Sequence, residues 1–441
     1  MNALARRMYS LLMTLGQPLL RYKLARRGRK EPGYLEAIEE RFGHYAQPVE
    51  NAPDLVWLHA VSLGETRTAA MLLKALRAQH PKLRILLTHG TATGRAEGAA
   101  LLQAGDVQVW QPWDSPAVVA RFFSHFKPRV GLLMETEIWP NMVAEAQARA
   151  MPLLLVNGRL SEKSLKKALR VAPLSLPAYR ALAAVFAQTA ADAARFSQLG
   201  AAVAGVFGNL KFDATPSASQ HAQGRAWRRA VAQPVLMFAS SRDGEEEPFL
   251  RQISAVVHKG RLQAAIDSVA YAGSRDVRFL IVPRHPQRFG EVEALVAQHG
   301  LRVSRRSGWG GSPADSDEAM LADVWMGDSL GEMALYYGLS DVALLGGSFE
   351  PLGGQNLIEA AACGCPVVMG PHTFNFTEAA ALAEAEGAAF RVAEMTEAVP
   401  AALALMSNSP ALTKATTAGL VFAARNRGAT ARTLEALRIY L

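Results

Sequence analysis

Short apolar runs alternate with helical patterns over most of the chain. In the first half, apolar runs of four to six residues lie at 55–60, 83–88, 107–110, 130–134, 153–156 and 184–187. Stretches with helical periodicity, such as 68–79 and 141–149, separate them. Apolar runs this short are typical of parallel strands that are buried on both faces. The pattern therefore predicts repeated strand–helix–strand units.

The same alternation restarts after a polar break at 213–224 (DATPSASQHAQG). Further apolar runs lie at 235–239, 279–282, 301–303, 324–326, 342–345 and 367–369. Residues 411–441 have a helical pattern, and 304–318 are rich in glycine, serine and charge and predict an exposed loop. The chain is therefore expected to be an α/β protein with two Rossmann-like, doubly wound domains that face a cleft.

We place the predicted domains at 31–215 and 225–425, with a separate helix at 426–441. The G-x-G-x-x-G dinucleotide motif does not occur in either half. Two such domains without that motif suggest a glycosyltransferase of the GT-B type, although sugar epimerases and periplasmic-type binding proteins share the outline.

Charge separates residues 1–30 from the rest of the chain. This segment has eight basic residues and no acidic one, whereas the remainder balances at 39 basic and 39 acidic residues. A nucleic-acid-binding protein would spread basic residues over a face of its body, so no nucleic-acid partner is expected. The apolar stretch at 8–20 is too short to span a bilayer and contains Gly16 and Pro18. We expect a basic amphipathic helix on an anionic membrane surface; a disordered tail or a helix docked on the body is the alternative.

The stretch 341–376 has the pattern of a nucleotide half-site. An apolar run ends in Gly346-Gly347-Ser348, and a second glycine pair, Gly353-Gly354, precedes a helical run at 356–362. Glycines let the backbone approach a phosphate, and free N–H groups at the turn and the helix start would face it. Glu359, one turn inside that helix, is predicted to bind the hydroxyls of a ribose. The neighbouring Cys363 and Cys365 are expected to be small buried residues.

Candidate catalytic side chains follow predicted strands of the first domain. Glu65 lies in the first turn after the strand at 55–60 and suits a general base, or alternatively a helix-start acid that interacts with the helix dipole. Glu135 and Glu137 follow the strand at 130–134 and form either an active-site wall or a helix cap. Lys211 precedes the polar break and could meet a departing phosphate, or be solvated.

In the second domain, Arg284 follows the strand at 279–282 and offers a planar fork to a phosphate. The turn at 330–332 follows the strand at 324–326, and its backbone could read a base edge. Asp315-Ser316-Asp317 has the form of a DxD metal motif, but it lies in the glycine- and serine-rich segment and is short enough to arise by chance.

Taken together, the motifs resemble those of the 3-deoxy-D-manno-octulosonic acid (Kdo) transferases of lipopolysaccharide synthesis. The series, in the family's order, is HAVSLGE, METEIWPN, GNLKFD, PRHPQRF, GDSLGEM, GGSF, GGQNLIEAA and MGPHTFNF, and it spans residues 59–376. The resemblance implies a GT-B fold, CMP-Kdo as donor, a lipid A precursor as acceptor, inversion at the anomeric centre and no metal or other cofactor. It also implies attachment at the cytoplasmic face of the inner membrane through the segment 1–30.

By motif match, the resemblance assigns roles to individual residues. Glu65 becomes the general base, and Glu135 and Lys211 become the residues that stabilise the transition state. The implied CMP contacts are Pro283, Arg284, Leu330, Gly331, Glu332, Asn356, Leu357, Ile358 and Glu359.

Two features depart from the family pattern. Gln355 stands where a histidine is expected, and the stretch at 258–276 is longer than usual. Another inverting GT-B transferase with a different nucleotide sugar, or a non-catalytic nucleotide-sugar sensor at the membrane, are the alternatives. A sensor would not need Glu65, Glu135 and Lys211 together.

Overall fold

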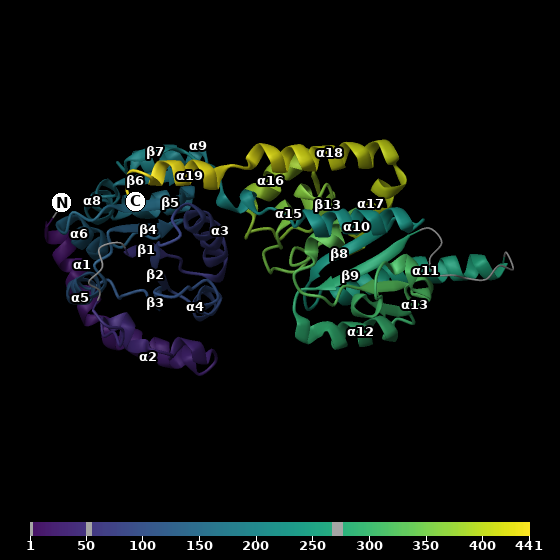
Figure 1. The fold of residues 1–441 in the computed structure, drawn as a ribbon, viewed down its shortest axis with the longest axis horizontal. Helices are drawn as coiled ribbons and strands as arrows, with labels where there is room; N and C mark the ends of the chain where they lie inside the picture. Colours follow the sequence, from purple (N-terminus) through teal and green to yellow (C-terminus); the bar gives the residue numbers. More distant parts are fainter. Residues whose placement is uncertain (1–2, 50–54, 267–276) are drawn as a thin grey trace. The chain divides into compact units, whose positions relative to one another are not determined.

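The structure is a computed structural model that describes residues 3–49, 55–266 and 277–441. The chain forms two compact units (Figure 1). Unit 1 comprises Met1–Asp213 and Asn426–Leu441, and unit 2 comprises Ala214–Arg425. The chain thus leaves unit 1 once and returns to it through its last helix, α19 (Ala429–Leu437).

Unit 1 is built on a seven-stranded parallel sheet with the order β3-β2-β1-β4-β5-β6-β7. Its strands are β1 (Leu55–His59), β2 (Arg84–His89), β3 (Val107–Trp110), β4 (Val130–Met134), β5 (Leu153–Gly158), β6 (Ala184–Ala187) and β7 (Val203–Val206). Its other helices are α1 (Ala3–Leu15), α2 (Gln17–Gly28), α3 (Leu63–Gln79), α4 (Ala92–Ala99), α5 (Pro116–Phe126), α6 (Pro140–Ala148), α7 (Glu162–Arg170), α8 (Ala172–Arg180) and α9 (Ala190–Gln198). Short 3₁₀ turns are η1 (Pro32–Tyr34), η2 (Ile38–Phe42) and η3 (Leu210–Asp213).

Unit 2 has a second seven-stranded parallel sheet with the order β10-β11-β9-β8-β12-β13-β14. Its strands are β8 (Val235–Ser241), β9 (Arg278–Pro283), β10 (Val303–Arg305), β11 (Val324–Met326), β12 (Val342–Leu345), β13 (Val367–Met369) and β14 (Ala389–Arg391). Its helices are α10 (Ala218–Ala230), α11 (Glu246–Ile266), α12 (Phe289–Gln298), α13 (Asp317–Leu321), α14 (Met333–Leu339), α15 (Leu357–Ala362), α16 (Thr377–Ala385), α17 (Met395–Ser407) and α18 (Ser409–Asn426). Its 3₁₀ turns are η4 (Pro286–Arg288), η5 (Arg306–Gly308) and η6 (Pro313–Asp315).

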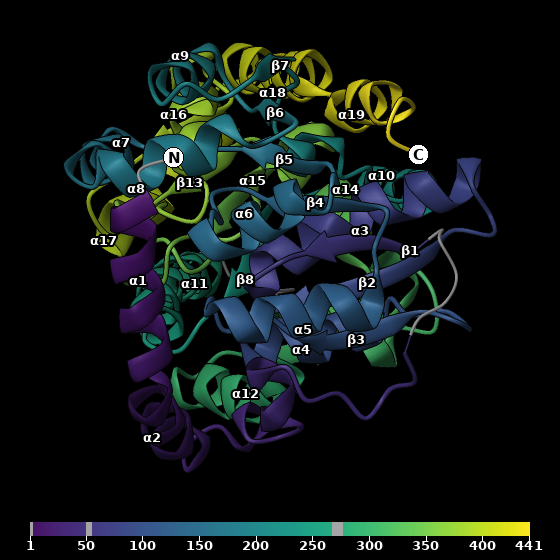
Figure 2. The same cartoon turned by 90° about the vertical axis from the view of Figure 1, so that its left-hand side faces the viewer.

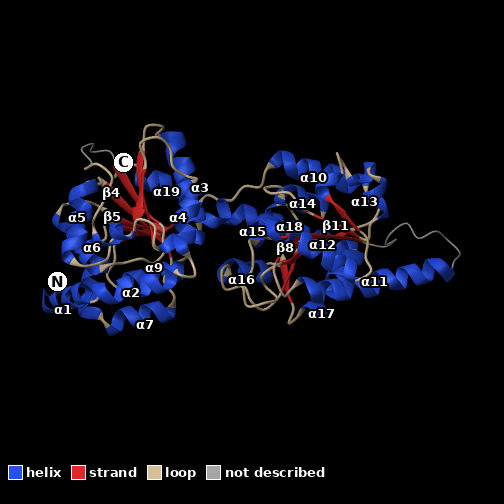
Figure 3. Ribbon diagram, turned by 90° about the horizontal axis from the view of Figure 1, so that it is seen from below, coloured by secondary structure: helices blue, strands red, loops and turns tan. Residues whose placement is uncertain are grey.

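Helices cover both faces of each sheet (Figure 3). In unit 1, alternate strand residues face two different cores: one core includes side chains of α5, α6, α8 and α9, and the other includes side chains of α3 and α19. Successive residues of a strand point to opposite faces, so a strand that is apolar throughout can serve both cores. The predicted doubly wound α/β architecture is confirmed.

Side-chain caps fix where several helices of unit 1 begin. Ser62, Thr91, Ser161 and Thr189 each accept a hydrogen bond from the backbone N–H three residues further on. These residues follow strands β1, β2, β5 and β6. Since serine and threonine at such positions satisfy N–H groups that would otherwise lack partners, each helix starts close to the carboxyl end of its strand. The helix-start side chains of unit 1 are thereby brought to one edge of its sheet.

The twelve predicted strands are present, although β10 begins at Val303, two residues after the predicted start. The edge strands β7 and β14 were not predicted. The sequence of β7, VAGV, alternates between half-buried and exposed positions, and β14 has only three residues. An edge strand needs no continuous apolar run, so its pattern is too weak to recognise.

The predicted break at 213–224 contains the boundary between the two units, which follows Asp213, but most of its residues are helical. Helix α10 begins at Ala218, with Ser217 as its cap, so the irregular chain is shorter than expected. Gly224 lies against α14, where an added Cβ would come 2.1 Å from the carbonyl oxygen of Leu335. The small residues therefore permit a close contact between two helices, and they were misread as a linker.

The predicted exposed loop at 304–318 is also wrong. Trp309 is only 5% exposed and makes edge contacts with Trp227 and Trp325. The Arg306 guanidinium lies 4.8 Å from the centre of the Trp227 ring. One tryptophan in a polar segment thus anchors it to the body of unit 2. By contrast, Cys363 and Cys365 are buried, as predicted.

The N-terminal segment forms two helices that lie on unit 1 (Figure 2). Tyr9 donates a hydrogen bond to Asp114 at 2.9 Å, and Ser10 donates one to Asn141 at 2.8 Å. Trp113 donates its indole N–H to the carbonyl oxygen of Met13. Among the described residues, no helix is both long enough and apolar enough to cross a membrane. Of the predicted long stretch at 258–276, residues 267–276 lie outside the described residues.

Candidate functional site

Glu65 lies at the carboxyl edge of the sheet of unit 1, in the first turn of α3. Its Oε2 accepts a hydrogen bond from the backbone N–H of Val61 at 2.8 Å, and its Oε1 accepts one from the Ser62 hydroxyl at 3.0 Å. The Ser62 oxygen in turn accepts from the Glu65 N–H. This reciprocal arrangement resembles a capping box. Glu65 therefore has the structural role at the helix start that the sequence offered as an alternative.

The carboxyl of Glu65 is also perturbed in a way that capping does not require. Burial raises its pKa to about 7, and the negative charges of Glu135 and Glu137 add to the rise. The hydrogen bonds from Val61 and Ser62 act in the opposite direction. A carboxyl with a pKa near neutrality can take and return a proton at physiological pH, which suits a general base.

Glu135 directly follows β4 and faces Lys211. The Lys211 Nζ lies 3.5 Å from Glu135 Oε1, and both side chains are about one-fifth exposed. Glu135 has φ 60°, a left-handed conformation that is unusual for a side-chain-bearing residue. Its backbone is held there because its N–H donates to Val156 and its carbonyl oxygen accepts from the N–H of Arg159. The structure thus positions this carboxylate through neighbouring strand β5.

Lys211 is placed by the turn η3, which follows β7. The N–H of Leu210 donates to the side chain of Asn157 at 3.0 Å, and Leu210 itself is fully buried. The last residue of this turn is held as well, since the Asp213 carboxylate accepts hydrogen bonds from the N–H groups of Gly428 and Thr430. Lys211 therefore extends from a fixed backbone, and its ammonium group is directed to Glu135.

Glu137 lies in the loop between β4 and α6. Its carboxylate accepts the indole N–H of Trp139 at 2.8 Å, and burial raises its pKa. Its charge acts on Glu65 as well as on Tyr179. Sequence reasoning left open whether Glu135 or Glu137 organises charge in the site. The structure gives Glu135 the lysine partner and Glu137 the tryptophan.

The carboxylates and the lysine gather because β1 and β4 are neighbours in the sheet. Their register pairs His59 with Leu133, so Glu65 and Glu135 follow the ends of adjacent strands. Three carboxyl groups with one ammonium group form a small, partly buried polar cluster. Glu65, Glu135 and Lys211, which were predicted separately, are thus close together in unit 1.

The predicted nucleotide contacts lie at the corresponding edge of the sheet in unit 2. Arg284 follows β9, and its N–H donates to the carbonyl oxygen of Ser241 at 3.0 Å. Burial raises the pKa of Glu359, and the positive charge of Arg284 lowers it in part. Asn356 caps α15 by accepting from the N–H of Ile358. Leu357 and Ile358 are buried, so their side chains are not accessible to a ligand.

The turn at 330–332 follows β11, next to β9 in the sheet. Leu330 is 74% exposed, and Gly331 has φ 76°, which glycine tolerates without strain. Glu332 pairs with Arg306 at 3.4 Å. The three predicted segments at 283–284, 330–332 and 356–359 therefore follow strands β9, β11 and β12 of one sheet. Their roles as CMP contacts stay predictions.

The expectation of a phosphate cradle at Gly346-Gly347-Ser348 is wrong in one respect. The buried carboxylate of Glu245 already accepts the N–H groups of Gly347 at 2.7 Å and of Phe349 at 3.0 Å. The N–H of Gly354 donates to the carbonyl oxygen of Gly347. Because an internal carboxylate occupies the donors that a phosphate would use, this turn is a structural joint between β12 and the loop after β8.

The part of the chain that the structure describes has no obvious metal-binding site. There, no group of three or more His, Cys, Asp or Glu side chains is arranged to hold an ion. The DxD-like segment serves another purpose, since Ser316 caps α13 by accepting from the N–H of Ala319. Metal independence stays a prediction.

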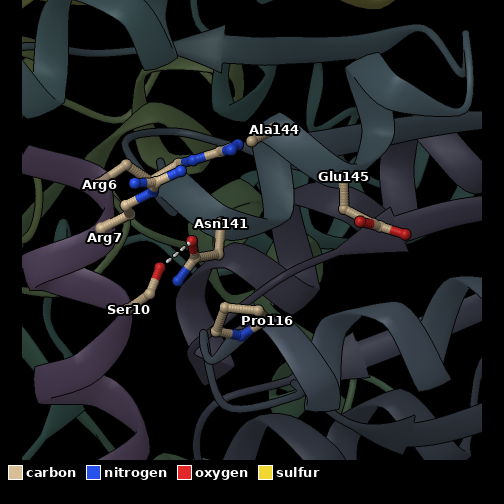
Figure 4. A pocket seen from close by; sticks show the side chains of 7 residues that line it. All are labelled: Arg6, Arg7, Ser10, Pro116, Asn141, Ala144 and Glu145. Carbon is tan, nitrogen blue, oxygen red and sulfur yellow. Dashed lines mark hydrogen bonds between the residues drawn. The ribbon is translucent and has the colours of Figure 1, made fainter. Parts of the chain in front are cut away.

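A cavity of about 300 Å³ lies between the N-terminal helix and unit 1's helices α5 and α6 (Figure 4). Arg6 and Arg7 of α1 and Glu145 of α6 line it, together with Ser10 and Asn141, which are hydrogen-bonded to each other. In Figure 4 the two arginine side chains extend toward Ala144. The cavity is therefore bordered by the positive charge of the N-terminal segment.

Known proteins agree with the motif series. A family model for 3-deoxy-D-manno-octulosonic-acid transferase (Kdo transferase) matches residues 36–214. The 3-deoxy-D-manno-octulosonic acid transferase of Bordetella pertussis is 42% identical over 99% of this chain and 100% of that protein. The corresponding protein of Haemophilus influenzae is 30% identical over 98% of each chain.

A solved glycosyltransferase from Rickettsia africae shares the fold, with a TM-score of 0.50 and 13% identity over 88% of this chain and 98% of that one. At 13% identity, this structural similarity supports the GT-B fold but no statement about substrate or residue roles. The near full-length match to the Bordetella protein covers both units, including every motif quoted above. The resemblance is thus confirmed: the chain is a glycosyltransferase and belongs to the family of 3-deoxy-D-manno-octulosonic acid transferases.

Proposed function

We propose that this enzyme transfers Kdo from CMP-Kdo to a lipid A precursor, with inversion at the anomeric carbon, in lipopolysaccharide core biosynthesis. The observation that carries the proposal is the cluster of unit 1, where Glu65 has a pKa of about 7 and lies near the Glu135–Lys211 pair. Family membership supports the donor and the acceptor. Glu65, Glu135 and Lys211 supply the chemistry of the transfer.

Glu65 acts as the base. It takes the proton from an acceptor hydroxyl while that oxygen forms a bond to the anomeric carbon of Kdo. The bond from that carbon to the phosphate oxygen breaks at the same time, and CMP leaves as a phosphate monoester. In such displacements the attacking hydroxyl and the leaving group are on opposite faces of the sugar, so the configuration inverts. The transferred proton remains on Glu65, whose raised pKa accommodates it.

Lys211 and Glu135 act on charge that develops during transfer. A sugar that passes through an oxocarbenium-like state separates positive charge on the ring from negative charge on the phosphate. The ammonium of Lys211 can stabilise the departing phosphate, and the carboxylate of Glu135, at 3.5 Å, holds that ammonium in place. Lys211 and Arg284 thus supply positive charge without a metal ion, and Glu135 orients the lysine.

Unit 2 holds the nucleotide in this proposal. Arg284 binds the phosphate, Glu359 binds the ribose, and the backbone of Leu330, Gly331 and Glu332 contacts the base. The partial burial of Glu359 beside Arg284 supports a polar pocket at this edge of the sheet.

The rate of transfer is expected to fall below about pH 7. The raised pKa means that Glu65 is protonated, and unable to act as a base, as the pH falls through that value. The logarithm of kcat/KM should therefore rise with a slope of one up to about pH 7 and then level off. A transfer assay with CMP-Kdo and the lipid A precursor across pH 5–9 measures this profile.

The variant Glu135→Gln tests whether Glu65 is the group that titrates in this pH profile. Removing this negative charge should lower the pKa of Glu65 and move the acidic limb to lower pH, in addition to lowering the plateau. An acidic limb at the same pH in both proteins, or a wild-type limb near pH 4.5, would contradict the assignment of the titration to a perturbed Glu65.

We further propose that α1 lies on an anionic membrane surface. Its apolar residues Leu4, Met8, Leu11, Leu12 and Leu15 are each more than half exposed. The opposite side of the helix carries the contacts of Tyr9 and Ser10 to unit 1. An exposed apolar face on a helix that also carries Arg6 and Arg7 suits a helix in the plane of the interface.

Replacing Met8, Leu11 and Leu15 with Gln should reduce binding to anionic phospholipid vesicles by at least about 100-fold. Each side chain would lose about 1 kcal/mol or more of transfer free energy. Sedimentation with vesicles measures the change. The matched control Leu420→Gln/Val421→Gln alters exposed apolar residues of α18 and should bind like the unchanged protein. Equal binding by the triple variant would contradict the proposal.

A further inference from the structure

The loop after β8 presents an arginine next to the predicted phosphate-binding residue. Strands β8 and β9 are adjacent and parallel, and their register pairs Ser241 with Pro283. The next residues along the two strands are Arg242 and Arg284. The N–H of Arg284 donates to the carbonyl oxygen of Ser241, which holds the two strand ends together. Arg242 was not singled out from the sequence.

The backbone of Arg242 is fixed from both sides. Its N–H donates to Glu245 Oε2 at 3.0 Å, and its carbonyl oxygen accepts from the N–H of Glu245 at 3.1 Å. The same carboxylate binds the N–H groups of Gly347 and Phe349, beyond the end of β12. Glu245 thus joins the loops after β8 and β12, and Arg242 starts from a rigid position between the ends of β9 and β12.

Not every arginine at the carboxyl edge of this sheet is paired with a carboxylate. Arg288 pairs with Glu246 and Glu291 at 2.9 Å and with Asp243 at 3.4 Å, so three carboxylates surround it. The half-buried Arg242 side chain has no hydrogen bond or ion pair to any residue that the structure describes. Partial burial and the charges of Arg242, Arg284 and Arg288 lower the pKa of His285, which shows that these cations converge. An anionic ligand would complete the arrangement.

We propose that Arg242 is a donor-binding residue that holds the carboxylate of the Kdo sugar, while Arg284 holds the phosphate. This assignment rests on the proposed function, because it takes CMP-Kdo as the donor. That donor has two anionic groups, the phosphate of CMP and the carboxylate that makes the sugar an acid. A guanidinium can bind a carboxylate through two parallel hydrogen bonds.

The order of groups along the donor decides which arginine takes which anion. The charge of Arg284 acts on Glu359, the predicted ribose contact, so Arg284 lies on the nucleotide side. The phosphate is attached to the ribose and therefore reaches Arg284 first. The sugar is attached to the other side of the phosphate, and Arg242, at the end of the adjacent strand β8, is the neighbouring cation that can bind its carboxylate.

Comparing the binding of CMP and of CMP-Kdo to an Arg242→Gln variant shows whether Arg242 contacts the sugar carboxylate or the phosphate. We expect KM for CMP-Kdo to rise about 10- to 100-fold, the usual loss for a charged hydrogen bond, while the inhibition constant of CMP changes less than about twofold. Arg242→Lys should recover part of the loss. Arg284→Gln should weaken both ligands.

The exposed Arg251 of α11 supplies the matched control, since Arg251→Gln should leave both constants unchanged. Equal weakening of CMP and CMP-Kdo by Arg242→Gln would place the residue on the phosphate and overturn the assignment, as would no weakening of either. A wild-type enzyme that does not turn over CMP-Kdo would instead contradict the proposed function. Equal melting temperatures of the variants exclude unfolding as the cause.

Discussion

The Glu65→Gln enzyme is expected to transfer Kdo about 10²- to 10⁴-fold more slowly than the wild type, with little change in its binding of CMP-Kdo. Removing a positioned general base costs a rate factor of this size. The carboxylate of Glu65 belongs to unit 1, whereas the proposed donor contacts belong to unit 2. Steady-state kinetics with CMP-Kdo and the lipid A precursor give kcat, and donor titration gives the binding constant.

Glutamine keeps the structural role of Glu65 while removing its basicity. It has the size of glutamate and can take the same place in a capping box, so the melting temperature should change little. Glu162 is a matched control, since it is also an acid in the first turn of a helix, α7, next to a serine cap, and it is 67% exposed. Glu162→Gln should keep full activity. A Glu65→Gln enzyme with kcat within about fivefold of the wild type would contradict the base assignment.

Replacing Lys211 with Met should lower kcat by about 10²- to 10³-fold. A preorganised charge that stabilises a developing negative charge typically contributes this much. The Lys211 side chain is 22% exposed and its ammonium pairs with Glu135, so water compensates only partly for its loss. Because the two residues act as a pair, Lys211→Met combined with Glu135→Gln should cost much less than the product of the single effects.

A surface lysine distinguishes this effect from a general change of charge. Lys163, in the first turn of α7, is exposed, and Lys163→Met should leave kcat unchanged. Additive effects in the double variant would indicate that Lys211 and Glu135 act independently. A Lys211→Met enzyme with unchanged kcat and a raised KM would place the lysine in substrate binding instead.

The sequence contained most of the information about the sheets. Buried parallel strands are apolar throughout, so β1, β4, β8 and β12 stand out as short runs between helices. Since ligands bind at the carboxyl ends of such strands, the positions of Glu65 and Arg284 followed from the strand ends alone. The assigned roles of Glu135 and Lys211, however, came from the family resemblance.

Contacts between distant residues could not be predicted in this way. Lys211 meets Glu135 because the turn η3, which follows β7, is hydrogen-bonded to Asn157 of β5, the strand next to β4. Glu245 is about a hundred residues from the glycine turn that it binds, and a carboxylate that replaces a phosphate leaves no local pattern. The segment around Trp309 was predicted to be exposed because most of its residues are polar. The burial of the single Trp309 ring is enough to hold it against unit 2.

Kdo transfer through the cluster of unit 1 is tested most directly by mass spectrometry of the lipid product. Purified wild-type protein, incubated with CMP-Kdo and the lipid A precursor, should give a lipid heavier by a whole number of Kdo residues. The Glu65→Gln protein, sampled while the wild type is still in its initial-rate phase, should give at most about 1% as much modified lipid. An unmodified lipid with the wild type, or equal modification by the Glu65→Gln protein, would contradict the proposed transfer.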